Sequence, residues 1–136
     1  MKKIYIASNF STRYRLQPIK FQLKKLGFEV LSEWIDNNPM DNVLDRGSDS
    51  IGDHLEVTRA IAERDWNEVY TCDIFIIDTQ NSGRHGGREV ELGMAIMRQV
   101  PYIFRVGPIR NVFHAYKAVR VFKSWEELLP VLEKLI

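Results

Sequence analysis

Hydrophobic and polar residues alternate along the chain in blocks that predict strands and helices in turn. Short apolar runs predict strands at 4–7, 28–35, 73–78, 102–106 and 119–122. Apolar residues that recur every three or four positions predict helices at about 13–26, 54–70 and 88–98, with a further helix from 124 to the C-terminus. Strands that alternate with helices predict a parallel sheet covered by helices on both faces.

Several helix ends are marked by capping residues. Gly27 is expected to close the first helix, and Pro18 is expected in its first turn, where a missing N–H matters least. Ser124 and Glu127 form a capping box for the last helix. The polar stretch 36–53 has no clear period, which is typical of a lid, a binding loop or a disordered segment.

Composition predicts an ordinary soluble domain covering residues 1–136. The chain is 45% hydrophobic and 27% charged, and no run of 18 apolar residues predicts a membrane helix. The apolar run after Lys3 is too short for a signal peptide, and the single cysteine, Cys72, excludes an internal disulfide. We therefore expect a cytoplasmic protein with no membrane partner.

Charge gives no indication of a nucleic-acid partner. The chain has nineteen lysines and arginines and eighteen aspartates and glutamates, so it carries little net charge, and the basic residues are scattered along it. The histidines at 54, 85 and 114 lack metal-ligand spacing, so neither a metal nor another cofactor is predicted.

Candidate chemistry gathers in the segments that follow strands, because open parallel sheets bind ligands at the carboxyl ends of their strands. Glycines at 83, 86 and 87 precede a helix, but neither a Walker loop nor a dinucleotide fingerprint is present. On the glycines alone, a tight turn explains this loop as well as a ligand does. Glu89 and Glu91 point to different sides of the helix, so at most one faces a shared cleft. Paired with Asp65, Glu91 would provide the nucleophile and acid of glycosidic chemistry, although an aspartate in an amphipathic helix is usually just solvated.

Segments 4–8, 63–65, 73–78 and 86–95 resemble, in this order, the nucleoside 2-deoxyribosyltransferase superfamily, which includes the 2'-deoxynucleoside 5'-monophosphate N-hydrolases. The resemblance extends to about residues 111–114. It implies a flavodoxin-like, Rossmann-like α/β fold, a doubly wound parallel sheet of about five strands. It also implies N-glycosidic chemistry without a cofactor, and a homodimer or higher homo-oligomer whose sites are completed across subunits.

By this resemblance, Glu91 is the nucleophile that attacks C1' of the sugar. Asp65 protonates the leaving base or holds its nitrogen, and Tyr5 forms a hydrogen bond near the nucleophile. Glu89 falls outside the motif.

The resemblance also assigns substrate-binding residues. Ser8, Asn9 and Ser11 occupy the loop that holds a 5'-phosphate in the phosphohydrolases. His85 stands where the transferases carry an acidic residue, beside Gly86 and Gly87. Asn111 falls where some relatives extend a residue into the neighbouring subunit's site.

The leading hypothesis is cleavage or transfer at the N-glycosidic bond of a (deoxy)nucleoside or nucleoside 5'-monophosphate, a small-molecule partner. The alternative is a non-catalytic nucleotide-binding or signalling module on the same fold, suggested by the glycine-rich loop. A third reading is an interaction domain, suggested by aromatic residues near Phe113.

Overall fold

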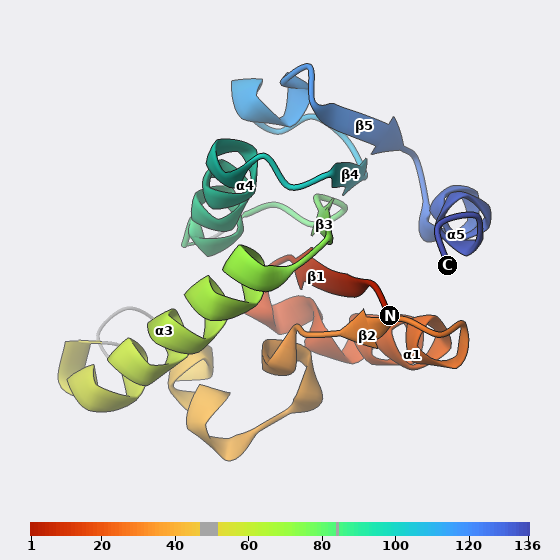
Figure 1. Ribbon diagram of the computed structural model, residues 1–136. Coiled ribbons are helices and arrows are strands. Elements are labelled where there is room, and N and C mark those ends of the chain that lie inside the picture. Colours follow the sequence, from red (N-terminus) through yellow and green to blue (C-terminus); the bar gives the residue numbers. More distant parts are fainter. Residues whose placement is uncertain (47–51, 84) are drawn as a thin grey trace.

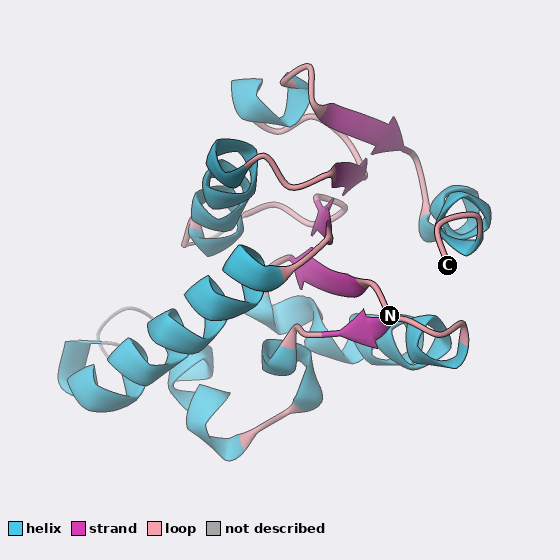
Figure 2. Cartoon of the chain, viewed as in Figure 1, coloured by secondary structure: helices cyan, strands magenta, loops and turns pink. Residues whose placement is uncertain are grey.

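Five parallel strands form the centre of the molecule in the order β2-β1-β3-β4-β5 (Figures 1 and 2). The structure is a computed structural model that describes residues 1–46, 52–83 and 85–136. The strands are β1 (Lys3–Ala7), β2 (Glu29–Val30), β3 (Ile74–Asp78), β4 (Tyr102–Val106) and β5 (Val119–Phe122). This order is that of flavodoxin-like sheets, whose switch point lies between β1 and β3. The predicted fold class is confirmed.

Helices cover both faces of the sheet. The longer ones are α1 (Arg13–Lys25), α3 (Leu55–Thr71), α4 (Gly87–Arg98) and α5 (Trp125–Glu133). Figure 1 shows α1 and α5 on one face and α3 and α4 on the other. Short 3-10 helices are η1 (Phe10–Thr12), η2 (Glu33–Asp36), η3 (Pro39–Arg46) and η4 (Val112–Ala115). None of the helices among the described residues has both the length and the apolar character to span a bilayer.

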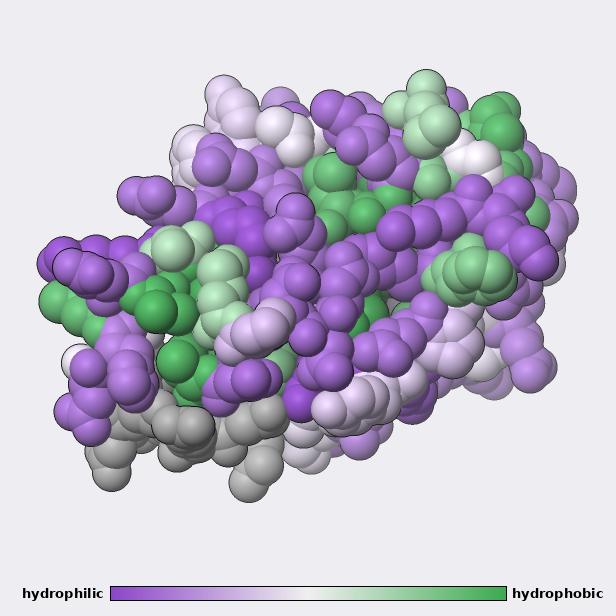
Figure 3. Space-filling view, turned by 90° about the horizontal axis from the view of Figure 1, so that it is seen from below, coloured by the Kyte–Doolittle hydropathy of each residue, from purple (hydrophilic) through white to green (hydrophobic). Residues whose placement is uncertain are grey.

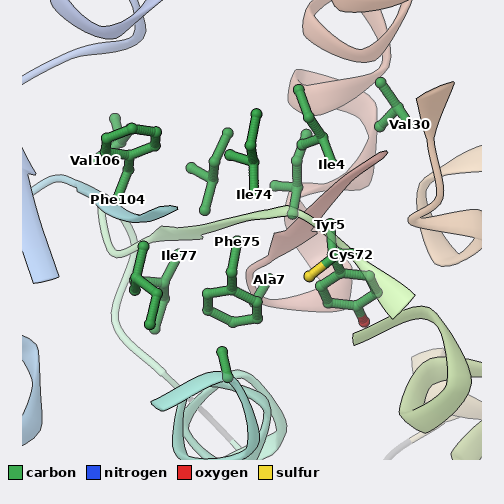
Figure 4. Close-up of a cluster of buried hydrophobic side chains, with 14 of the residues drawn as sticks. Ile4, Tyr5, Ala7, Val30, Cys72, Ile74, Phe75, Ile77, Phe104 and Val106 are labelled. Atoms are coloured by element: carbon green, nitrogen blue, oxygen red, sulfur yellow. The ribbon is translucent and has the colours of Figure 1, made fainter. Parts of the chain in front are cut away.

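The core lies on both faces of the sheet. All five residues of β3 are buried, as is typical of a parallel strand that is covered on each side. Successive side chains alternate between the faces, so Tyr5 and Phe75 point toward α3 and α4 while Ile4 and Ile74 point the other way (Figure 4). The rings of Tyr5 and Phe75 stack with centroids 5.9 Å apart. The view in Figure 3 is largely hydrophilic, because amphipathic helices turn their apolar sides inward.

The prediction of a strand over residues 28–35 is wrong beyond its first few residues. Only Glu29 and Val30 pair with β1. Further along β1, the backbone of Ile6 bonds to side chains in place of a neighbouring strand. Its N–H donates to Ser32 Oγ at 2.6 Å, and its carbonyl accepts from Trp34 Nε1 at 2.8 Å. The apolar run therefore reflects the burial of a 3-10 helix against the sheet rather than a strand.

Two further expectations need correction or extension. Pro18 lies in the second turn of α1, because that helix already begins at Arg13. The polar stretch 36–53 is not a plain loop, since η3 occupies Pro39–Arg46, while residues 47–51 lie outside the described part. Gly27 has a φ of 107° directly after α1, and Glu127 N donates to Ser124 Oγ at 3.2 Å, so both predicted caps are confirmed.

Candidate active site

The centre of the candidate site is a hydrogen bond between a strand and a helix. Tyr5 Oη, from the middle of β1, donates to Glu91 Oε2 at 2.5 Å. Tyr5 is fully buried, and Glu91, at the start of the second turn of α4, is partly buried. Burial, followed by the charge of Glu91, raises the pKa of Tyr5 well above its ordinary value. Tyr5 therefore keeps its proton and can donate a hydrogen bond to the ionised carboxyl group of Glu91.

Burial and two acidic residues of α3, Asp65 and Glu68, raise the pKa of Glu91. Burial first, and then the charges of Asp65 and Glu68, raise the pKa of Glu91 to about 8, while the Tyr5 hydrogen bond opposes this rise. Burial also raises the pKa of Asp65 to about 6, although Arg64 opposes it. Glu68 reaches a pKa of about 8 through burial, opposed by the hydrogen bond from the backbone N–H of Glu33. The site is thus a carboxyl cluster that retains protons near neutral pH.

The position of Asp65 along α3 explains how it reaches this cluster. The 17 residues of α3 extend ~25 Å at 1.5 Å per residue, whereas a five-residue strand extends only ~17 Å. The helix therefore begins beyond the carboxyl edge of the sheet, and Figure 1 shows this overhang. Asp65 lies six residues, or ~9 Å, before the C-terminal end of α3, and that end leads into β3 at the amino edge of the sheet. Asp65 is therefore level with the middle of the strands, where Tyr5 lies. The predicted pairing of Asp65 with Glu91 is consistent with this geometry.

An arginine next to Asp65 links it to η3. Arg64 donates to both carboxylate oxygens of Asp41 at 2.9 Å and also binds Asp65 Oδ1 through Nε at 3.0 Å and Nη2 at 2.9 Å. Sequence reasoning missed Arg64, Asp41 and Glu68 as parts of the site. The spacing of three residues from Asp65 to Glu68 placed both on one helix face and was readable. Nothing in the sequence pointed to Asp41.

The glycine-rich loop leads into α4 through a left-handed residue. Gly86 has a φ of 80° and precedes the first residue of the helix. Apart from the chain neighbours and the backbone of α4, no atom of the described residues lies within 4 Å of the position that a Cβ would take at Gly86 or Gly87. His85 is exposed beside them. Arg88, which is buried, donates to the carbonyls of Asp78 and Asn81 and ties this loop to the end of β3. The surface at Gly86 and Gly87 is therefore open, at the start of the helix that carries Glu91.

The loop after β1 lies against the loop after β3. Asn9 Nδ2 donates to the carbonyl of Ser82, and Ser8 Oγ accepts from Thr12 Oγ1 at 3.0 Å. Ser11 is exposed on η1. Ser8 and Asn9 therefore stand at the carboxyl edge between β1 and β3, where the fold places its ligands.

Asn111 and Glu89 belong to a second network beside the site. Asn111 Nδ2 donates to Glu89 Oε2 at 2.9 Å, while its side-chain oxygen accepts from the backbone of Phe113 at 2.9 Å. His114 Nε2 contacts the same Glu89 oxygen at 2.6 Å. Burial raises the pKa of Glu89, but hydrogen bonds from Arg88, His114 and Asn111 outweigh burial and lower it overall. Glu89 and Glu91 thus serve different networks, as their two-residue spacing predicts.

Asp78 fixes the edge of the sheet beneath these loops. This buried carboxylate, at the end of β3, accepts from Arg15 at 2.9 and 3.2 Å and from Trp125 Nε1 at 2.8 Å. It therefore joins α1 and α5 to the central strand. Within the residues that the structure describes, no group of three or more histidine, cysteine or acidic side chains is arranged to hold a metal ion.

The chain was compared with protein-family models, curated proteins and solved structures. No protein-family model matches the sequence, and no curated protein matches it. Among solved structures, the chain is similar to a 2-deoxyribosyltransferase from the psychrotolerant bacterium Bacillus psychrosaccharolyticus. The TM-score is 0.68 at 22% identity, over 93% of this chain and 89% of that one. The chain therefore has the fold of a nucleoside 2-deoxyribosyltransferase, as its sequence motifs indicate.

Proposed function

We propose that this protein cleaves the N-glycosidic bond of a deoxynucleoside or deoxynucleoside 5'-monophosphate, with Glu91 as the nucleophile. The observation that carries the proposal is the 2.5 Å hydrogen bond from Tyr5 to Glu91, beside Asp65. The similar 2-deoxyribosyltransferase supports the substrate class, because its name describes transfer of deoxyribose. Glycosidic chemistry requires two carboxyl groups, one as nucleophile and one as acid, and here the first accepts a hydrogen bond from a buried hydroxyl group.

The reaction divides the work between the two carboxyl groups. Glu91 Oε2 is occupied by Tyr5, so Oε1 forms the new bond to C1' as the bond between C1' and the base nitrogen breaks. The proton held by Asp65 passes to the departing base, whose nitrogen receives the electron pair of the broken bond. Water or a second base then attacks C1', loses its proton to the now ionised Asp65 and releases Glu91, giving hydrolysis or transfer with retained configuration.

The cluster as a whole holds the proton and the charge that this division needs, with the proton resting on the group of higher pKa. The nucleophile must be ionised while the acid is protonated, and the carboxyl groups of Glu91 and Asp65 have raised pKa values of about 8 and about 6. Between these values the pair holds one proton and one negative charge, which is the combination that the reaction uses. The higher pKa of Glu91 places this proton on Glu91 in the resting pair, so the proton must move to Asp65 before C1' is attacked. The hydrogen bond from Tyr5 stabilises the ionised Glu91 that results.

The surrounding loops supply the substrate contacts of the proposal. Ser8, Asn9 and Ser11 face the sugar and any 5'-phosphate, while His85, Gly86 and Gly87 line the base side of the same opening. Asn111 serves this site from its own subunit or a neighbouring copy in a homodimer. The exposure of Val112 (77%) and Phe113 (64%) beside it supports contact with a second copy.

The test is release of free base from a panel of deoxynucleosides, ribonucleosides and their 5'-monophosphates, followed by chromatography. Wild-type protein should release base, Glu91→Gln should not, and Glu63→Gln should match wild type, because Glu63 is exposed on α3 and carries the same charge. Adding a second base distinguishes transfer from hydrolysis. Tight nucleotide binding without base release would contradict the proposal and favour a non-catalytic binding module.

A further inference from the structure

Arg64 bridges two carboxylates beside the candidate site. It forms four hydrogen bonds to two carboxylates, two to Asp41 and two to Asp65 Oδ1. The side chain of Asp41 is fully buried and that of Arg64 is 11% exposed, so solvent competes little with these bonds. The arrangement fixes the guanidinium in one orientation.

The contacts distinguish the two oxygens of Asp65. Both hydrogen bonds from Arg64 reach Oδ1, and among the described residues no hydrogen bond reaches Oδ2. A proton on this carboxyl group is therefore directed to Oδ2, because Oδ1 already accepts two N–H groups. We propose that Arg64, anchored on Asp41, is a positioning residue that holds Asp65 through Oδ1 and presents Oδ2 to the leaving base. This inference rests on the proposed function.

The role requires an arginine and an anchor. Only the planar guanidinium presents enough N–H groups to bind Asp41 through two oxygens and Asp65 through one at the same time, whereas an ammonium group has no such fork. Asp41 comes from η3, in the polar stretch that the sequence left without an assignment. A segment remote from the glycine-rich loop thereby helps to set the geometry of the acid.

Arg64 also controls the proton affinity of Asp65. The charged and titratable groups packed around Asp65 are Arg64 and Glu68 of α3, Asp41 of η3, Glu33 of η2, Glu91 of α4 and Tyr5 of β1. The cation of Arg64 lowers the pKa of Asp65, and the anion of Asp41 raises it. Removing the charge of Arg64 should therefore raise the pKa of Asp65, and removing the charge of Asp41 should lower it.

The experiment compares Arg64→Met, Arg64→Lys and Asp41→Asn with wild type, by base-release kinetics and by carbon-13 NMR titration of the Asp65 carboxyl group. Arg64→Met should lower kcat about 10- to 100-fold, the range that misplaced catalytic groups produce, with a much smaller change in KM. Its Asp65 pKa should rise. Arg64→Lys should keep the Asp65 pKa closer to wild type but lose most of the kcat. Asp41→Asn should lower the Asp65 pKa.

A double variant separates a loss of folding from a loss of function. Arg64→Met leaves a buried charge on Asp41, so the double variant Arg64→Met/Asp41→Asn removes that charge and should show the same loss of kcat. Wild-type kcat in the folded double variant, or an Asp65 titration that does not change in Arg64→Met, would overturn the positioning role. Absence of base release from wild type would instead overturn the proposed function. The NMR titration would then decide on its own whether Arg64 controls the protonation of Asp65.

Discussion

Tyr5→Phe isolates the hydrogen bond that organises the candidate site. The substitution removes one oxygen and keeps the ring that stacks on Phe75 at 5.9 Å, so the packing of the sheet should survive. Hydrogen bonds to charged groups contribute about 1.5–3 kcal/mol, which corresponds to about one to two pKa units. Because the Tyr5 hydroxyl lowers the pKa of Glu91 from a still higher value, its loss should raise that pKa above about 8.

The kinetic consequence has a defined sign. With the ionised form of Glu91 less favoured, kcat for base release should fall about 10- to 150-fold, the rate equivalent of that free energy. The pH above which activity declines should move upward, because the last proton of the cluster is held more tightly. Steady-state base release measured across the pH range provides both quantities.

A matched control is available on β4. Tyr102 makes no side-chain hydrogen bond within the described residues and stacks on Phe104 at 6.2 Å, so Tyr102→Phe should leave the kinetics unchanged. Equal kcat and an unmoved pH profile in Tyr5→Phe would refute the reasoning, because the hydroxyl would then contribute nothing to the state of Glu91.

Two further predictions concern pH. The wild-type kcat/KM should be bell-shaped, rising as one carboxyl group of the cluster ionises near pKa 6 and falling as the last proton leaves near pKa 8; a profile flat from about pH 5 to about pH 9 would contradict the assignment. Stability should depend on Glu91 in the same interval. Its folded pKa is raised to about 8, so its contribution is present below its unfolded pKa and is lost as pH rises through about 8. Thermal unfolding should therefore show Glu91→Gln gaining in Tm over wild type at about pH 9 relative to about pH 5, and a difference that does not vary with pH would count against this.

The main architecture followed from patterns that burial imposes on sequence. The uninterrupted apolar run of β3 predicted a covered parallel strand, and the three- and four-residue spacing predicted α1. Residues 28–35 misled because a buried 3-10 helix needs the same apolar residues as a strand. The bonds of Ser32 and Trp34 to Ile6, which stop the strand, depend on tertiary contacts that no local pattern encodes.

The candidate site was predictable only in part. Motif resemblance brought Tyr5, Asp65 and Glu91 together, and the structure joins Tyr5 to Glu91 directly. Asp41 lies 23 residues from Arg64, in a segment without periodicity, so the bonds that join Asp41, Arg64 and Asp65 could not be predicted from sequence spacing. Glu68 was overlooked because an acidic residue on a helix is usually solvated, and only burial in the folded structure raises its pKa.

The most direct measurement of the central claim is detection of the covalent intermediate. Wild-type protein is mixed with a 2'-deoxynucleoside, quenched in acid during turnover, digested and mapped by mass spectrometry. The account predicts a deoxyribosyl adduct on the peptide that carries Glu91, absent from Glu91→Gln and present in Glu63→Gln. An adduct on a different residue, or base release that continues undiminished in Glu91→Gln, would contradict it.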